Sequence, residues 1–377
     1  MRKLTRRSML GGGLALAAGA YLWRRTRKPP LGMELSPASL ERGRALLADN
    51  PIVDVHSHAG RSFLAGAEPD SLMIRLMPDG YEDERIAGMR AHGVDAALLS
   101  IVADLPLLGI EDGGLRVTRD FAPGEAWADF SRQLDRLRSL AGRGIVQPAL
   151  DGDDVREAAQ TGVPVAILAS EGGDFIESDL ARLDEVHAAG LRSICLVHYN
   201  TNPLADNQTS APVHGGLSAF GAEVVERMNR LGLVVDVAHA SFAACRDVIG
   251  TSRAPVMLSH SNLRTASVDS PRFIAREHAR LLADSGGLIG AWPAGIGSAS
   301  LADFVTQVMA LVDVAGSEHV AIGSDLDGNY KPVLTEYADF PLLAAALLQR
   351  GMTAGEAGRV LGRNFLRLFD AVSTAST

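Results

Sequence analysis

The sequence holds few cysteines and few aromatic residues, and each shortage excludes a class of protein. Its only cysteines are Cys195 and Cys245 among 377 residues. Two cysteines at this spacing form no disulfide framework, so we expect two unpaired buried thiols. Aromatic residues make up 5% of the chain, which disfavours a platform on which nucleic-acid bases would stack.

Outside the N-terminus, acidic residues outnumber basic ones. The net charge is −9, yet residues 1–28 hold eight Arg and Lys residues and no acid. Removing these eight charges leaves −17 for residues 29–377. Because nucleic-acid binding needs a clustered basic face, an acidic body without a basic stripe predicts no nucleic-acid partner.

The N-terminal segment 1–33 is typical of an export signal. Arg6-Arg7 precede an uncharged run rich in Ala, Gly and Leu at residues 8–23, which is the form of a twin-arginine signal. The run is shorter than the ~20 apolar residues of a spanning helix. We expect export to the periplasm; without cleavage, residues 8–23 would tether the protein to the inner membrane, facing the periplasm. A basic tail on a cytosolic protein is the alternative.

Residues 34–377 alternate short apolar runs with helical patterns, which predicts one domain. Many runs are almost continuously apolar, as in parallel strands covered on both faces. The expected fold class is α/β, a (β/α)8 TIM-type barrel, which needs roughly 250 residues or more. Nine runs compete for eight places, and we take 145–149 as the extra one. The other runs are 52–55, 96–102, 164–168, 193–197, 233–237, 255–258, 287–291 and 320–323.

Two histidines end consecutive predicted strands. His239 follows the run 233–237 and His260 follows 255–258, with one helix expected between them. In a parallel α/β barrel the C-terminal ends of the strands carry the chemistry. Two imidazoles at one mouth therefore predict a metal site. Two histidines buried for structural reasons are the alternative.

Other candidate side chains follow other strands. His56 and His58 are two residues apart, so in an extended segment both imidazoles point to one side. Glu171 comes after the run 164–168, before two glycines, where a solvated loop glutamate is the alternative. His198 follows the run 193–197, and Asp325 follows 320–323.

The shortage of lysine bears on how two metals would be bridged. Many binuclear barrels use a carboxylated lysine, but this chain has only Lys3, Lys28 and Lys331. None of them ends a strand near the histidines, although Lys331 follows Asp325 by six residues. A carboxylate would have to bridge instead, and Glu171 is the best placed.

In this order, the motifs resemble those of the renal (membrane) dipeptidase family, zinc peptidases of the amidohydrolase superfamily. The likeness extends from residue 50 to residue 371. The stretches that carry it are 53–58, 170–173, 196–206, 216–218, 235–241, 259–261, 322–328 and 361–367.

The resemblance implies a zinc-dependent dipeptidase with two Zn²⁺ ions per chain, bridged by Glu171. The ligands of the first ion would be His56, His58, Glu171 and Asp325. The ligands of the second ion would be Glu171, His239 and His260.

The resemblance also implies roles in catalysis. A metal-bridging hydroxide would attack the peptide bond of a dipeptide, and Asp325 would act as the base. The catalytic set would be Asp325, His198 and Glu171. His198 would contact the substrate and stabilise the oxyanion. Arg272 would bind the substrate carboxylate, with Arg264 on the same loop as its competitor.

Two positions depart from the family pattern. His58 stands where the family commonly has Asp, which raises the net charge of the site by one and should make bound water more acidic. Asp174 stands where the family often has His.

Two other functions compete with the dipeptidase. One is another binuclear amidohydrolase, acting on a lactone, a cyclic amide or a phosphoester. The other is a non-catalytic barrel that serves as a binding protein, and the complete ligand set argues against it. A homodimer is compatible with the sequence.

Overall fold

The computed structural model describes residues 28–67, 80–111 and 114–375. The predicted twin-arginine motif and the run 8–23 lie outside the described residues. Residues 28–33 of the predicted signal segment are described, and Leu31 and Met33 pack against the hydrophobic core. In the part of the chain that the structure describes, no helix has the length and apolar character needed to cross a membrane.

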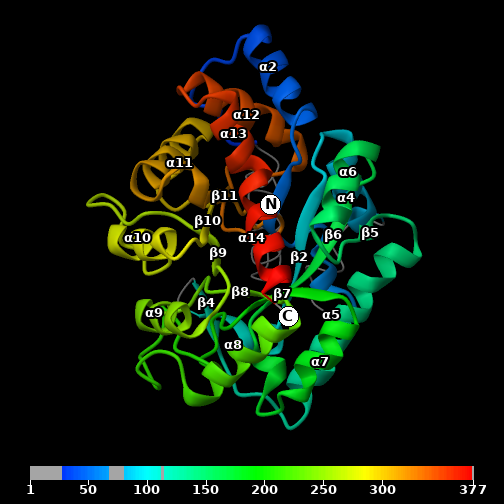
Figure 1. Cartoon of the computed structure of the whole chain (residues 1–377), viewed down its shortest axis with the longest axis vertical. Coiled ribbons are helices and arrows are strands. Elements are labelled where there is room, and N and C mark those ends of the chain that lie inside the picture. Colours follow the sequence, from blue (N-terminus) through cyan, green and yellow to red (C-terminus); the bar gives the residue numbers. More distant parts are fainter. Residues whose placement is uncertain (1–27, 68–79, 112–113, 376–377) are drawn as a thin grey trace, which may run out of the picture.

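Eight parallel strands close into a barrel, which confirms the predicted (β/α)8 fold (Figure 1). The hydrogen-bonded order is β2-β1-β11-β10-β9-β8-β7-β6, and β6 returns to β2. That last pairing runs without interruption from Ala96 opposite Val165 to Val102 opposite Glu171. The strands are β1 (Val53–Ser57), β2 (Ala96–Val102), β6 (Val165–Glu171), β7 (Leu191–Cys195), β8 (Val234–Asp236), β9 (Met257–Ser261), β10 (Leu288–Ala291) and β11 (Val320–Ile322).

Each predicted strand overlaps an observed one. The run 145–149 is a two-residue strand, β5 (Gln147–Pro148), which pairs with β6 outside the closed ring. It is therefore the extra strand, as expected. Every residue of β2 and β6 is buried. Since side chains alternate between the faces of a strand, both faces are covered, which explains the continuous apolar runs.

Helices surround the barrel (Figure 1). Ser218 caps α8 by accepting a hydrogen bond from the Gly221 amide, and Ser241 caps α9 in the same way from Ala244. The helices are α2 (Pro37–Ala48), α4 (Tyr81–Ala91), α5 (Glu125–Gly142), α6 (Gly152–Thr161), α7 (Ala181–Ala188), α8 (Ala219–Leu231), α9 (Phe242–Thr251), α10 (Arg276–Asp284), α11 (Leu301–Ala315), α12 (Phe340–Gln349), α13 (Ala354–Gly358) and α14 (Asn364–Thr374).

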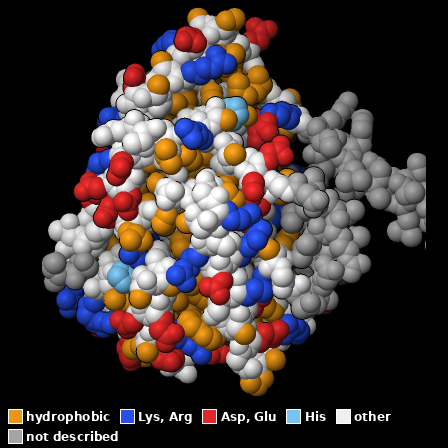
Figure 2. Space-filling view, turned by 90° about the vertical axis from the view of Figure 1, so that its right-hand side faces the viewer, with side chains coloured by type: hydrophobic (Ala, Val, Ile, Leu, Met, Phe, Trp, Pro, Cys, Tyr) orange, Lys and Arg blue, Asp and Glu red, His pale blue; other side chains and the backbone are white. Residues whose placement is uncertain are grey.

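An antiparallel hairpin after β2 was not predicted. It consists of β3 (Leu108–Glu111) and β4 (Gly114–Val117), with Ile110 opposite Leu115. Its strands are four residues long and neither is buried, so the hydrophobic pattern that marks the barrel strands is missing. Figure 2 shows another side of the surface, where acidic and basic side chains are interspersed rather than gathered in a single-sign stripe.

Candidate metal centre

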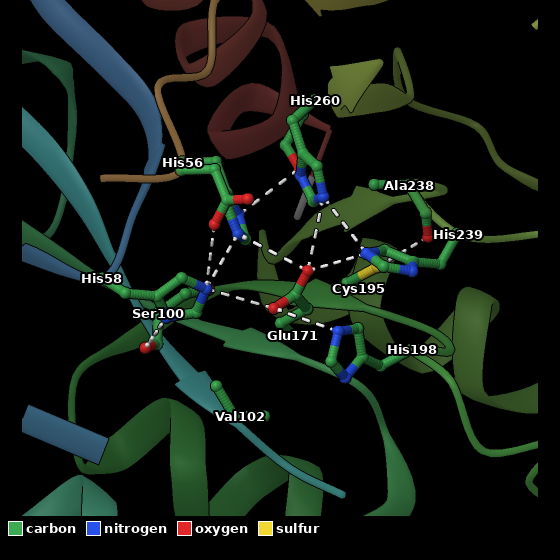
Figure 3. Close-up of polar contacts among 12 residues, drawn as sticks. His56, His58, Ser100, Val102, Glu171, Cys195, His198, Ala238, His239 and His260 are labelled. Atoms are coloured by element: carbon green, nitrogen blue, oxygen red, sulfur yellow. Dashed lines mark hydrogen bonds and ion pairs between the residues drawn. The ribbon is translucent and has the colours of Figure 1, made fainter. Parts of the chain in front are cut away.

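Five histidines surround the carboxylate of Glu171 at the C-terminal mouth of the barrel (Figure 3), and four of them, His56, His58, His239 and His260, form possible metal-binding groups with it. Glu171 is the last residue of β6. His56 lies in β1 and His58 directly follows it. His260 lies in β9, and His239 comes three residues after β8. All five side chains are buried, so segments distant in sequence meet at one enclosed point.

The five side chains form two groups that share Glu171, namely His56, His58 and Glu171, and Glu171, His239 and His260. In the first group, His58 Nε2 lies 3.1 Å from Glu171 Oε2 and 3.2 Å from His56 Nε2. In the second, His239 Nε2 lies 2.8 Å from Glu171 Oε1 and 3.1 Å from His260 Nε2. Glu171 Oε1 also lies 3.4 Å from His260 Nε2 and 3.6 Å from His56 Nε2. The carboxylate therefore lies between the two groups, and Oε1 is within reach of both.

These separations fit zinc. A tetrahedral centre with Zn–N bonds of about 2.0–2.1 Å holds its ligand atoms roughly 3.3 Å apart, close to the two Nε2–Nε2 distances. Two imidazole nitrogens at this range point toward a shared position, where a cation is favoured. In the second group the cationic guanidinium of Arg272 takes that position, with Nη2 2.8 Å from His239 Nε2 and 2.9 Å from His260 Nε2, and a zinc ion there would displace it. Glu171 supplies the anionic oxygen that each group needs.

The outer nitrogens of three of these rings have partners that hold the rings in place. His58 Nδ1 donates to the Ser100 carbonyl at 3.0 Å. His260 Nδ1 lies 3.0 Å from the Ser259 hydroxyl, and His56 Nδ1 lies 3.5 Å from the same oxygen. Partners of this kind orient a ligating histidine and direct Nε2 toward the metal.

Burial keeps most of the cluster in the protonation state that metals bind. It lowers the pKa of His56 to about 3 and the pKa values of His239 and His260 well below their usual range, so these imidazoles are neutral. Burial alone would raise the pKa of Glu171, but the neighbouring histidines, His198 foremost, outweigh it and hold that pKa well below normal. For His58, burial would lower the pKa, but the hydrogen bond to Glu171 outweighs it and raises the pKa. Three neutral imidazoles around a carboxylate are metal-binding chemistry.

Asp325 lies beside the first group, three residues after β11. Its Oδ1 is 3.6 Å from His58 Nε2, while its Oδ2 accepts a hydrogen bond from Trp292 Nε1 at 3.0 Å. Burial is the main cause that raises the pKa of Asp325 to about 7. One oxygen is thus held by the indole, and the other faces the cluster.

His198 completes the mouth. Its Nε2 lies 3.5 Å from Glu171 Oε2, and its Nδ1 lies 2.6 Å from Asp104 Oδ1. Burial would lower the pKa of His198, but the carboxylates of Asp104 and Glu171 outweigh it and raise the pKa to about 9.

Arg272 reaches the site and Arg264 does not. Arg272 is buried, and its Nη2 donates to His239 Nε2 at 2.8 Å and to His260 Nε2 at 2.9 Å. Its Cζ lies 5.2 Å from the centre of the Trp292 ring. Arg264 instead pairs with Asp269 at 3.1 Å, with 46% of its side chain exposed.

Asp174 is buried but does not belong to either ligand group. Its Oδ1 accepts a hydrogen bond from Asn200 Nδ2 at 2.7 Å. Gly172, with φ of +101°, fits between these segments because a Cβ there would lie 2.8 Å from Asp174 Oδ2 and 3.1 Å from the Ala103 Cβ. The glycine therefore permits the close approach of β2 and β6 at the mouth.

Sequence reasoning missed two residues of the site, Asp104 and Trp292. Both follow predicted strands, 96–102 and 287–291, at the end of the barrel where function is expected. That position was the signal that could have found them. Both cysteines are buried free thiols, as expected.

A TIM-type barrel with histidines and a shared carboxylate at its C-terminal mouth defines a metal-dependent hydrolase. A family model described as membrane dipeptidase, peptidase family M19, matches residues 40–377. The chain belongs to this family and is a hydrolase of the metallo-dipeptidase type. It is 31% identical over 360 residues to dipeptidase verJ of Clonostachys rogersoniana, covering 91% of this chain and 90% of that protein.

Solved structures agree on the fold. A probable dipeptidase, PvdM, from Pseudomonas aeruginosa superposes with a TM-score of 0.75 at 21% identity, covering 90% of this chain and 100% of that chain. A metallopeptidase from Rhodobacter sphaeroides, liganded with a phosphinate mimic of the dipeptide L-Ala-D-Ala, superposes with a TM-score of 0.72 at 20% identity. That match covers 86% of this chain and 99% of the other.

Proposed function

We propose that this hydrolase is a zinc-dependent dipeptidase that holds two Zn²⁺ ions bridged by Glu171. The observation that carries the proposal is the position of the Glu171 carboxylate between the two histidine pairs, with Oε2 3.1 Å from His58 Nε2 and Oε1 2.8 Å from His239 Nε2. The first ion would be held by His56, His58, Glu171 and Asp325. The second would be held by Glu171, His239 and His260.

Zinc ions bound there would lower the pKa of water toward ~7 and polarise the scissile carbonyl. The protein supplies the remaining chemistry. His198 Nε2, at the rim of the cluster, donates a hydrogen bond to the oxygen that becomes negative as the carbonyl is attacked. The Asp325 carboxylate, oriented by the Trp292 N–H on Oδ2, would take a proton from the attacking water and pass it to the leaving amine.

Arg272 would recognise the free carboxylate of the substrate. The side-chain atoms Nε and Nη1 are buried and have no hydrogen-bond partner among the described residues, so two donors remain for a ligand. A guanidinium binds a carboxylate through two parallel hydrogen bonds and stays charged at any working pH. Carboxylate recognition one residue beyond the scissile bond would restrict the enzyme to dipeptides.

The substrate class includes dipeptides with a D-residue at the second position. The support is the Rhodobacter sphaeroides peptidase, whose structure contains a mimic of L-Ala-D-Ala. L-Ala-L-Ala and L-Ala-D-Ala are therefore the first pair of substrates to compare.

The test compares a dipeptide, its C-terminal amide and the corresponding tripeptide on the zinc-loaded protein. We expect cleavage of the dipeptide and rejection of the other two. Equal hydrolysis of amide and dipeptide would exclude carboxylate recognition. Cleavage of lactones or phosphotriesters in place of peptides would favour another binuclear amidohydrolase.

We also propose that the protein is exported by the twin-arginine route and works in the periplasm, free or tethered to the inner membrane through residues 8–23. The support is the sequence alone, Arg6-Arg7 before an uncharged run.

A further inference from the structure

Asp104 is a buried carboxylate that lies directly behind His198. It follows β2 by two residues and is completely buried. Its Oδ1 accepts a hydrogen bond from His198 Nδ1 at 2.6 Å. A bond this short between a carboxylate and an imidazole N–H is of the charge-assisted kind, which is the stronger class.

The second oxygen of Asp104 holds the chain on which His198 stands. Oδ2 accepts the backbone N–H of Tyr199 at 3.0 Å and of Asn200 at 2.9 Å. With three donors on two oxygens, the carboxylate has one orientation. The imidazole and the peptide units after it are fixed by the same group.

The backbone around Asp104 is fixed to the metal centre as well. The amide of Ala103 donates to the carbonyl of Glu171 at 2.9 Å. This hydrogen bond fixes the position of Asp104 relative to Glu171, whose carboxylate is shared by the two ligand groups. From the opposite edge of its ring, His198 directs Nε2 at that carboxylate, 3.5 Å from Oε2.

We propose that Asp104 is a positioning residue for His198. By accepting the Nδ1 hydrogen it fixes the plane of the ring, so that Nε2 faces the reacting carbonyl. The inference rests on the proposed function, because it assigns Asp104 to the step in which His198 stabilises the oxyanion. It predicts that Asp104 contributes to kcat far more than to KM.

A purely structural role would use only the two hydrogen bonds from the amides of Tyr199 and Asn200. The variant Asp104→Asn distinguishes this role from the positioning of His198. The asparagine oxygen can still accept the backbone amides, but its NH₂ group then meets Nδ1 and reverses the hydrogen bond. The ring then keeps a hydrogen on Nε2, but the charge-assisted bond that fixes its plane is lost. We expect kcat to fall roughly 10- to 10²-fold with KM changed little, since loss of a whole oxyanion donor costs about 10²–10³.

A double-mutant cycle tests whether Asp104 acts through His198. In kcat/KM, His198→Ala and the double variant His198→Ala/Asp104→Asn should be equally impaired, because the asparagine has no ring left to misplace. The control is Asp206→Asn. Asp206 is another buried carboxylate near the mouth, and it accepts the amides of Val213, His214 and Gly216 at 2.7–2.9 Å.

Among the described residues, the Asp206 carboxylate accepts hydrogen bonds from backbone amides and none from a histidine side chain, so its effect should multiply with that of His198→Ala. If the effects of Asp104→Asn and His198→Ala also multiply, the proposal is overturned. Melting temperature and metal content, compared across all variants, identify any that are merely misfolded.

A second readout does not depend on activity. In the full-length protein labelled with ¹⁵N-histidine, the Nδ1–H proton of His198 should give a downfield, slowly exchanging resonance, assigned by its loss in His198→Ala. Asp104→Asn should abolish it, and Asp206→Asn should keep it. Persistence in Asp104→Asn would overturn the pairing. If the wild type cleaves no dipeptide, the proposed function fails while this resonance still decides whether Asp104 positions the ring.

Discussion

Three non-glycine residues at the metal centre have left-handed backbone conformations. They are His239 (φ +65°), Asp325 (φ +52°) and Asp327 (φ +66°), and two of them are proposed ligands. Such conformations cost roughly 1 kcal/mol or more each. Asp327 is held by the amide of Gly60 at 2.9 Å and by the guanidinium of Arg85 at 3.0 Å, contacts that offset the strain. At His239 and Asp325, this backbone conformation directs the side chains toward the metal centre.

Arg272→Ala tests carboxylate recognition at a single residue. We expect KM for dipeptides to rise, because the loss of a hydrogen bond to a charged group costs about 1.5–3 kcal/mol of binding free energy. The value of kcat should change less if the contact is equal in ground and transition states. The matched control is Arg264→Ala, which removes a half-exposed arginine of the same loop. Steady-state kinetics on one dipeptide decide between them. An equal rise in KM for both variants would contradict the assignment.

His278 should make stability depend on pH away from the metal centre. It lies in α10, its ring centre is 5.1 Å from that of Phe242, and burial lowers its pKa to about 4. The unfolded chain takes up the proton near pH 6.5 and the folded protein does not. Stability is therefore lost as the pH falls from about 6.5 to about 4, by about 2 kcal/mol between pH 7.5 and pH 5.

His278→Leu removes this proton. Urea unfolding at pH 7.5 and pH 5 measures the free energy of unfolding of both proteins. Between these pH values the wild type should lose about 2 kcal/mol more than the variant. Other groups titrate equally in both proteins and cancel. An equal change in the free energy of unfolding with pH in both proteins would refute the role of His278.

Among the elements, the loop after β11 depends on close packing at Gly328. A Cβ at this position would lie 2.6 Å from Asp325 Oδ1 and 2.6 Å from His58 Cδ2. Both neighbours are proposed ligands of the first metal, so Gly328→Ala must displace at least one. We expect its zinc affinity to fall by roughly 10- to 100-fold, as when the support of a ligand is lost.

Gly250 provides the control. It lies inside α9, where a Cβ would meet nothing within 4 Å. Gly250→Ala should keep zinc affinity and stabilise the helix by up to about 1 kcal/mol. Zinc titration against a chelator of known affinity measures both variants. Unchanged affinity in Gly328→Ala would mean that the loop yields without moving Asp325 or His58.

The barrel elements were predictable from sequence because parallel strands covered on both faces are continuous apolar runs. The ligand histidines were predictable because each follows such a run. The hairpin β3–β4 was not, since it lies half exposed and has no such pattern. Asp104 and Trp292 were missed although they follow strands, because their roles depend on partners from other strands, His198 and Asp325. Partners that are far apart in the sequence cannot be paired from the sequence alone.

For the molecule as a whole, the charge asymmetry is the feature that bears on location. The eight positive charges in residues 1–28 contrast with −17 over the rest. Replacing Arg6 and Arg7 together by lysine keeps this charge but removes the paired guanidinium groups of the twin-arginine motif. We expect the variant to stay in the cytoplasm while the wild type reaches the periplasm or its membrane, as read by cell fractionation. If the variant appears in the same cell fraction as the wild type, the export proposal is wrong.

The metal content of the purified protein tests the central claim, that Glu171 bridges two zinc ions. Elemental analysis should give two zinc ions per wild-type chain. His260→Ala should retain about one, since it removes a ligand of the second ion alone, and Glu171→Ala should weaken both sites. Melting temperature shows whether each variant is folded. Retention of two tightly bound zinc ions by a folded Glu171→Ala protein would contradict the account.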